Sequence, residues 1–194
     1  MTKTLGVLCA LGLLAASPAQ AAPITYTAAL SGAAEAPPNA SPGSGEAWVT
    51  FDDVAHTLRV KVTFSGLVGT VTASHIHCCT TTPFAGTAGV ATITPTFTGF
   101  PAGVSSGTYD RTFDTTLVGA FNPAFVTANG GTFAGAEAKL GVGLAEGRAY
   151  LNIHSTFAPG GEIRGFLTPV PEPATAALLG LGLAGLIANR RRRR

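Results

Sequence analysis

The chain has 194 residues, of which 46% are hydrophobic and only 11% are charged. Its formal net charge of +2 depends on Lys3 and the five arginines at 190–194, which lie in the terminal segments. Residues 22–169 hold six basic and nine acidic side chains, a net charge of −3 without a basic cluster. This composition excludes nucleic acid as a partner and corresponds to one ordinary domain.

The first 21 residues have the pattern of a secretory signal peptide. Lys3 precedes an apolar run over 5–16, and Ala19-Gln20-Ala21 supplies the small residues that signal peptidase requires. The run is too short to cross a membrane as a helix. We therefore expect export, with residues 1–21 removed by signal peptidase.

Alternating apolar and polar residues predict several short β-strands in residues 22–169. In the segment 57–64, Leu58, Val60, Val62 and Phe64 fall on one face and charged or threonine residues on the other. Segments that alternate in the same way are 24–30, 47–51 and 109–113. The intervening stretches are rich in Gly, Pro and Ser, so we predict a mainly β fold, an antiparallel β-sandwich or a barrel-like sheet.

Helix signals are confined to residues 122–147. Asn122-Pro123 and Asn129-Gly130 bracket one short segment with helix-capping residues. In 133–145, Phe133, Leu140 and Leu144 share one helical face, and Gly147 follows as a stop. We expect one or two short helices that cover an opening of the β-structure.

Three histidines form the main candidate site. If 71–77 is extended, His75 and His77 share a face about 6–7 Å apart. His154 follows an isoleucine and precedes a Pro-Gly turn, as His77 does, so it converges with them if the two strands are neighbours. Three imidazoles are a competent set for zinc or copper. The alternative is a structural cluster bonded to backbone carbonyls, and His56, in the turn DDVAHT, is expected to be solvated.

The adjacent cysteines Cys78 and Cys79 leave three alternatives. Cys9 lies in the signal peptide, so they are the two thiols of the mature chain, and free thiols are unusual in an oxidising compartment. They form a vicinal disulfide, ligate a metal as thiolates, or bridge to another molecule. A vicinal disulfide closes a tight ring, because neighbouring Cα atoms are about 3.8 Å apart across a trans peptide.

Motifs typical of enzymes lack their structural context. Gly103-Val104-Ser105-Ser106-Gly107 has the spacing of a nucleophile elbow, but strand alternation follows it instead of a helix. The acidic residues are scattered, without a carboxylate pair suited to glycoside hydrolysis. We therefore assign no catalytic residue and expect no enzymatic activity, although metal-dependent redox activity stays open.

The C-terminal segment 170–194 has three parts. Pro171-Glu172-Pro173 precede an apolar run over 174–188, whose helix of about 22 Å is shorter than the hydrocarbon core of about 30 Å. The chain closes with Arg190, Arg191, Arg192, Arg193 and Arg194. This arrangement resembles the PEP-CTERM sorting signal of Gram-negative, biofilm-forming bacteria. The resemblance implies transient anchoring of a hydrophobic helix in the inner membrane, recognition by an exosortase, and delivery to the cell surface or extracellular matrix.

The central segment 22–169 resembles the CHRD domain, first named for repeats in chordin. The resemblance rests on blocks such as EAPP at 35–38, SHIH at 74–77 and GRAYLNIHSTFAPGGEIRG at 147–165. It implies a compact β-rich domain without an established enzymatic activity. We interpret the PGGEIRG block structurally, with a turn at Pro159-Gly160-Gly161 and with Glu162 and Arg164 pairing to neighbours.

Together these features predict an exported, surface- or matrix-associated CHRD domain protein with a non-enzymatic binding or structural role. Its partner would be an extracellular protein or polysaccharide that the sequence does not specify. The alternative is an extracellular copper- or zinc-binding protein with redox capacity. Its candidate ligands are His75, His77, His154, Cys78 and Cys79.

Overall fold

The computed structural model describes residues 22–171 together with Gly182, Asn189 and Arg190. The predicted signal peptide, most of the predicted C-terminal helix, Glu172, Pro173 and residues 191–194 lie outside the described residues. Among the residues that are described, no helix is long and apolar enough to cross a membrane.

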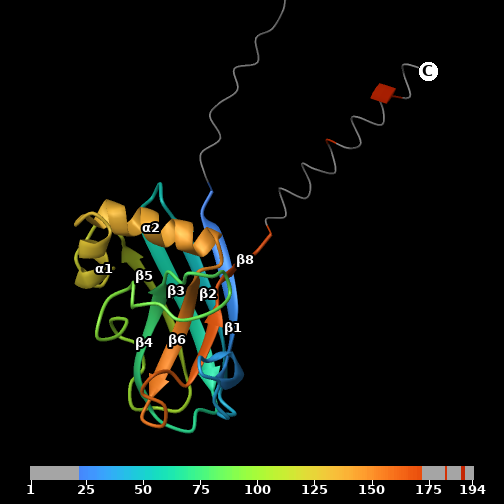
Figure 1. The fold of residues 1–194 in the computed structure, drawn as a ribbon, viewed down its shortest axis with the longest axis vertical. Helices are drawn as coiled ribbons and strands as arrows, with labels where there is room; N and C mark the ends of the chain where they lie inside the picture. The colour runs from blue at the N-terminus through green and yellow to red at the C-terminus, as the bar shows by residue number, and fades with distance from the viewer. Residues whose placement is uncertain (1–21, 172–181, 183–188, 191–194) are drawn as a thin grey trace, which may run out of the picture.

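One antiparallel sheet of eight strands forms the body of the domain (Figure 1). Its order is β4-β6-β7-β1-β2-β3-β5, and β8 pairs with β1. The strands are β1 (Ile24–Ser31), β2 (Ser44–Asp52), β3 (Thr57–Ser65), β4 (Val71–Cys78), β5 (Gly107–Asp114), β6 (Ala149–Ser155), β7 (Ile163–Phe166) and β8 (Thr168–Pro169). The mainly β prediction is therefore confirmed, and the alternating segments 24–30, 47–51, 57–64 and 109–113 fall in β1, β2, β3 and β5.

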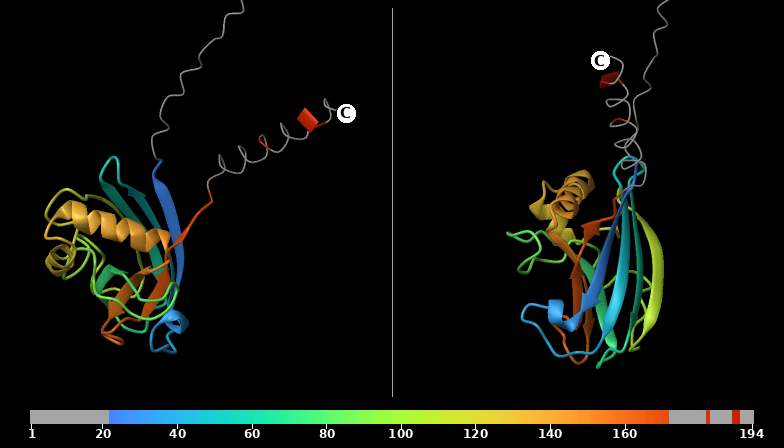
Figure 2. Two further views of the ribbon diagram at one scale, coloured as in Figure 1. Left: turned by 45° about the horizontal axis from the view of Figure 1, so that its top comes forward. Right: turned by 90° about the vertical axis from the view of Figure 1, so that its right-hand side faces the viewer.

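The sheet curls into a half-barrel instead of stacking two sheets (Figure 2). Of the two predicted architectures, the barrel-like one is present. The long connection after β4 helps to close it, because its backbone bonds to the free edge of β4 at Ser74 and Ile76. The same connection places Phe97 and Phe100 in the core, where both pack against Tyr109 of β5.

The alternation in β3 shows why one face of the sheet is apolar and buried. Leu58, Val60, Val62 and Phe64 are at most 4% exposed, whereas the residues between them face solvent. Each such side chain contributes roughly 1.5–3 kcal/mol by leaving water. A slip of one residue would turn this whole set outward, so the pattern also fixes the register.

Two helices cover one end of the half-barrel (Figures 1 and 2). They are α1 (Pro123–Ala128) and α2 (Phe133–Ala145), and a 3-10 turn, η1 (Gly32–Ala34), follows β1. Asn122 and Thr132 cap them by accepting the amide protons of Ala124 and Gly135, respectively. The predicted short helices are thus confirmed, with Leu140 and Leu144 of α2 buried in the core.

Helix α2 is also tied to the β2–β3 hairpin through a buried carboxylate. Glu137 accepts a hydrogen bond from the Thr115 hydroxyl, and its other oxygen lies 2.9 Å from His56 Nδ1. His56 is half exposed and occupies the left-handed region with φ of 54°. The expectation of a simply solvated His56 is therefore incomplete, because this histidine also anchors the helix.

Candidate functional site: a three-histidine cluster

The cluster lies on the face of β4 and β6 opposite the hydrophobic core. Ile76 of β4 and Leu151 and Ile153 of β6 point into the core, so the residues between them point outward. The register pairs Ala73 with His154 and His75 with Asn152. Since directly paired residues share a face, His75, His77 and His154 lie on one surface.

The three imidazoles are close neighbours in space. Their ring centroids are 5.2 Å apart for His75 and His154, 5.7 Å for His77 and His154, and 5.8 Å for His75 and His77. One nitrogen from each ring lies within 4.8 Å of the corresponding nitrogen of the other two. An ion bonded at 2.0–2.1 Å would draw these nitrogens to about 3.3 Å apart, a change that small ring tilts can supply.

Each ring donates a hydrogen bond to a backbone carbonyl through its other nitrogen. The bonds run from His75 Nε2 to Pro95 (2.5 Å), from His77 Nδ1 to Ala88 (2.9 Å) and from His154 Nδ1 to Pro159 (2.9 Å). A carbonyl oxygen only accepts hydrogen bonds, so these nitrogens carry the proton. The opposite nitrogen of each neutral ring therefore carries a lone pair. The remaining nitrogens, His75 Nδ1, His77 Nε2 and His154 Nε2, are buried without a hydrogen-bond partner.

The surroundings keep these rings neutral. Burial lowers the pKa of His75 and of His154, and it lowers the pKa of His77 to about 4. The carbonyl bonds oppose this effect, while the neighbouring imidazoles add to it at His75 and His77. Neutral imidazole is the form that binds metals, so at neutral pH no ring has to lose a proton before it acts as a ligand.

Aromatic and cationic side chains pack around the cluster. His77 stacks on Tyr150 with a centroid distance of 4.8 Å and an interplanar angle of 7°. The Arg164 guanidinium lies 4.7 Å from the Tyr150 ring centroid and donates to the carbonyls of Ala34 and Gly86. The connection after β4 crosses these strands (Figure 1), and its carbonyls at Pro95 and Ala88 accept the hydrogen bonds from His75 and His77.

A buried carboxylate extends the polar face beyond the histidines. Glu35 Oε2 lies 3.5 Å from the Asn152 amide nitrogen and 3.8 Å from Arg164 Nε. Burial raises the pKa of Glu35 to about 7, although Arg164 opposes the shift. The sequence interpretation assigned no site role to Glu35 or Asn152. The signal that could have found them is their place in the EAPP and NIH blocks.

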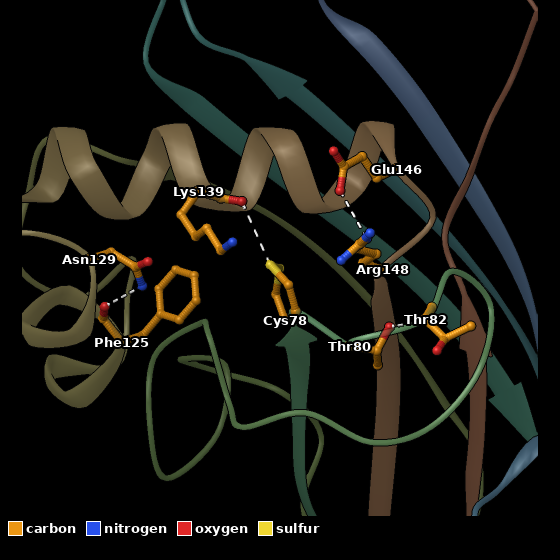
Figure 3. The surroundings of a disulfide bond; sticks show 9 residues. Cys78, Thr80, Thr82, Phe125, Asn129, Lys139, Glu146 and Arg148 are labelled. Atoms are coloured by element: carbon orange, nitrogen blue, oxygen red, sulfur yellow. Dashed lines mark hydrogen bonds and ion pairs between the residues drawn. A yellow bond between two sulfur atoms is a disulfide. The ribbon is translucent and has the colours of Figure 1, made fainter.

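The cysteines form a vicinal disulfide on the other side of the sheet (Figure 3). Cys78 belongs to the hydrophobic core beneath α2, and Cys79 Sγ lies 3.7 Å from the Lys139 carbonyl oxygen. The peptide bond between the two residues is cis. The disulfide is one of the three predicted alternatives, and in this disulfide form neither sulfur is a thiolate that could join the histidines.

Glu162 shows what a purely structural buried carboxylate looks like in this domain. It accepts hydrogen bonds from Ser41 Oγ (2.6 Å), Val68 N (2.6 Å), Gly69 N (3.2 Å) and the Ser155 hydroxyl. Burial alone would raise the pKa of Glu162, but these four donors lower it. The carboxylate thereby joins three separate loops, which agrees with the structural interpretation of PGGEIRG.

Comparisons with known families agree with this architecture. The fold is that of a small, mainly β domain followed by a short C-terminal segment. The CHRD domain model matches residues 26–167, and the chain belongs to this family. A second model, the PEP-CTERM protein-sorting motif, matches residues 169–194 and implies export and exosortase-mediated sorting to the cell surface. Searches of curated proteins and of solved structures gave no match.

Proposed function

We propose that this protein is a surface-delivered metal-binding module that holds one copper or zinc ion through His75, His77 and His154. One observation carries the proposal: three imidazoles each offer a nitrogen within 4.8 Å of the others, and each ring has one buried nitrogen without a partner while a carbonyl fixes the opposite one. Carbonyl bonds of this kind orient histidine ligands in metal sites by setting the tautomer.

The cost of unpartnered buried atoms favours an ion over a structural cluster. A buried polar atom without a partner costs roughly 1–3 kcal/mol, and three such atoms stand side by side here. A structural role explains the three nitrogens that bond to carbonyls but not the three that bond to nothing. Coordination by a shared cation would satisfy all three at once.

The ligand set restricts the ion to a small group. Neutral imidazoles suit zinc and copper, whereas calcium and magnesium prefer oxygen ligands. With both cysteine sulfurs in a disulfide, the set contains no thiolate from that pair. Copper would add redox capacity at the cell surface, and zinc would not.

We also propose that the module binds and does not catalyse. The elbow-like motif Gly103–Gly107 leads into β5 and not into the helix that a nucleophile elbow requires. A sorting motif that implies surface delivery is consistent with a protein that holds its ion outside the cell. An extracellular protein or polysaccharide partner stays compatible with this role.

The test is the metal content of the full-length chain, exported to an oxidising compartment and purified without a histidine tag. We expect about one copper or zinc ion per chain by elemental analysis, lost in the His75→Ala/His77→Ala double variant. His56→Ala is the matched control and should keep its ion, because His56 pairs with Glu137 away from the cluster. A wild-type chain that takes up neither ion on titration would contradict the proposal.

A further inference from the structure

The unpartnered polar atoms of the described residues are not spread over the fold. Five lie on the face that carries the histidines: His75 Nδ1, His77 Nε2, His154 Nε2, Asn152 Oδ1 and Glu35 Oε1. The sixth, Arg148 Nε, lies 2.9 Å from the Glu146 carboxylate and is therefore ion-paired. Native domains rarely leave buried polar groups unsatisfied, so five in one place indicate a missing ligand.

These five atoms divide into two chemical kinds. Each of the three nitrogens carries a lone pair that could bind a metal ion. Asn152 Oδ1 is a carbonyl-type oxygen, and Glu35 Oε1 belongs to a carboxyl group whose Oε2 faces the Asn152 amide nitrogen. The amide oxygen only accepts hydrogen bonds, and the carboxyl oxygen accepts them in the ionised form of Glu35, so the ion alone does not complete the face. A molecule bound beside the ion has to donate hydrogen bonds to these oxygens.

We propose that Asn152 and Glu35 form the outer half of the metal site, where they receive hydrogen bonds from a small hydroxyl-bearing ligand, water in the simplest case, in a coordination position that the histidines leave open. The inference rests on the proposed function and deepens it. It makes Asn152 and Glu35 positioning residues for the ligand, not ligands of the ion.

The composition of the cluster supports an open position. Structural zinc sites have four protein ligands, whereas sites that take an external ligand have three. Within the described part of the chain, no cysteine, aspartate or glutamate joins the three histidines. His154 is partly exposed while His75 and His77 are buried, so the cluster lies nearest to solvent at His154.

The Gly-Gly turn before β7 fixes the two outer residues. A Cβ atom on Gly161 would lie 2.5 Å from Asn152 Nδ2 and 2.7 Å from both Asn152 Oδ1 and Glu35 Oε1. The backbone of this turn therefore presses directly against the amide and the carboxyl group. At Gly160 a Cβ atom would meet nothing within 4 Å. The close approach at Gly161 therefore restricts the positions that the Asn152 amide and the Glu35 carboxyl group can take.

The hydrogen-bond chemistry of the outer half gives a selectivity that can be measured. A ligand with an O–H group donates a hydrogen bond to Asn152 Oδ1. Azide has no hydrogen to donate, so it leaves that oxygen without a hydrogen bond. Loss of one such bond is worth about 1 kcal/mol, or roughly fivefold in affinity. The site should therefore bind azide more weakly than it would without Asn152.

The experiment is an azide titration of the copper-loaded, full-length chain, followed by the azide-to-copper charge-transfer band. We expect wild type to bind azide, Asn152→Ala to bind it roughly fivefold more tightly, and Asn129→Ala, a control in the α1 cap, to match wild type. Asn152→Asp keeps the shape and the acceptor but adds negative charge, so it should bind azide more weakly than wild type. This isosteric variant decides the question if Asn152→Ala does not fold.

Copper content, measured first on each protein, separates the possible failures. A wild-type chain that takes up neither copper nor zinc would overturn the proposed function and this inference together. A copper-loaded chain that gives no azide band would overturn the open position alone. Equal azide affinity in wild type, Asn152→Ala and Asn152→Asp would show that Asn152 does not position the ligand.

Discussion

Two buried polar regions of this domain differ in one respect. At Glu162 the carboxylate oxygens accept four hydrogen bonds from the chain itself, two from hydroxyls and two from backbone amides. On the histidine face, five buried polar atoms have no partner at all. Both regions are enclosed, and both lie in the blocks that carry the family resemblance. The first is complete without a ligand and the second is not.

The difference separates a structural role from a binding role. A buried carboxylate that is fully satisfied stabilises the loops that supply its donors, so its function is the fold. A buried group of unsatisfied acceptors lowers the stability of the ligand-free domain. A bound ligand that supplies the missing bonds restores that stability.

The largest expected effect on stability is at Glu162. Glu162→Ala leaves four donors without their acceptor and should lower the free energy of unfolding by about 3–5 kcal/mol. Urea denaturation measures the loss, and Glu46→Ala, an exposed residue of β2, should change stability by no more than about 0.5 kcal/mol. Copper uptake by any folded Glu162→Ala protein should be intact. A loss below 1 kcal/mol would contradict the structural role.

Metal removal should affect the other region. At a free ion concentration of 100 to 1,000 times the dissociation constant, binding adds about 2.7–4.1 kcal/mol to wild-type stability. A chelator should remove this gain, and the His75→Ala/His77→Ala double variant should never show it. Thermal unfolding with and without the ion provides the measurement. An equal gain in the double variant would place the ion elsewhere.

The pH dependence of the metal-free domain should report on Glu35. Because the folded pKa of Glu35 is raised to about 7, the fold keeps a proton that the unfolded chain has already lost. The resulting stability is present below the unfolded pKa and is lost as pH rises through 7. Glu35→Gln cannot lose this proton. Relative to that variant, wild type should lose about 2–3 kcal/mol between pH 4.5 and 8.

Denaturation curves of the two proteins across this pH range give the comparison. Taking the difference between wild type and Glu35→Gln cancels the titration of the other groups. Parallel curves would mean that Glu35 is solvated and ionised at neutral pH.

The smallest effect is expected under α2, where the packing is complete without a ligand. A Cβ atom on Gly143 would meet the sulfurs of Cys78 and Cys79. Gly143→Ala should therefore destabilise the domain by about 1–3 kcal/mol through overpacking. Val142→Ala, at a half-exposed neighbouring position, is the control and should change little in the same denaturation assay. Equal stability of both variants would show that the helix shifts freely over the disulfide.

The sequence predicted the strands and helices well because their causes are local. Period-two alternation fixes the faces of β3, and cap residues mark the ends of α1 and α2. The convergence of His75, His77 and His154 was predictable as well, since it needs only strand geometry and one pairing of neighbours. That the sheet would curl, and not stack as two sheets, depends on the long connection after β4, which has no periodic pattern.

What the sequence did not predict depends on distant parts of the chain. Glu35 lies in a turn after β1 and reaches Asn152 of β6 only once β7 and β1 are paired. His56 and Glu137 are 81 residues apart, so no local pattern connects the turn to the helix. The cysteines were left between three alternatives because the partner of a thiol is set by folding, not by spacing.

The most direct test of the account is a crystal structure of the copper- or zinc-loaded protein, with the ion located by its anomalous scattering. We predict one ion about 2.0–2.1 Å from His75 Nδ1, His77 Nε2 and His154 Nε2. The three carbonyl bonds to the opposite nitrogens should be retained. An ion bound elsewhere, or a fully loaded crystal with no density between these three nitrogens, would contradict it.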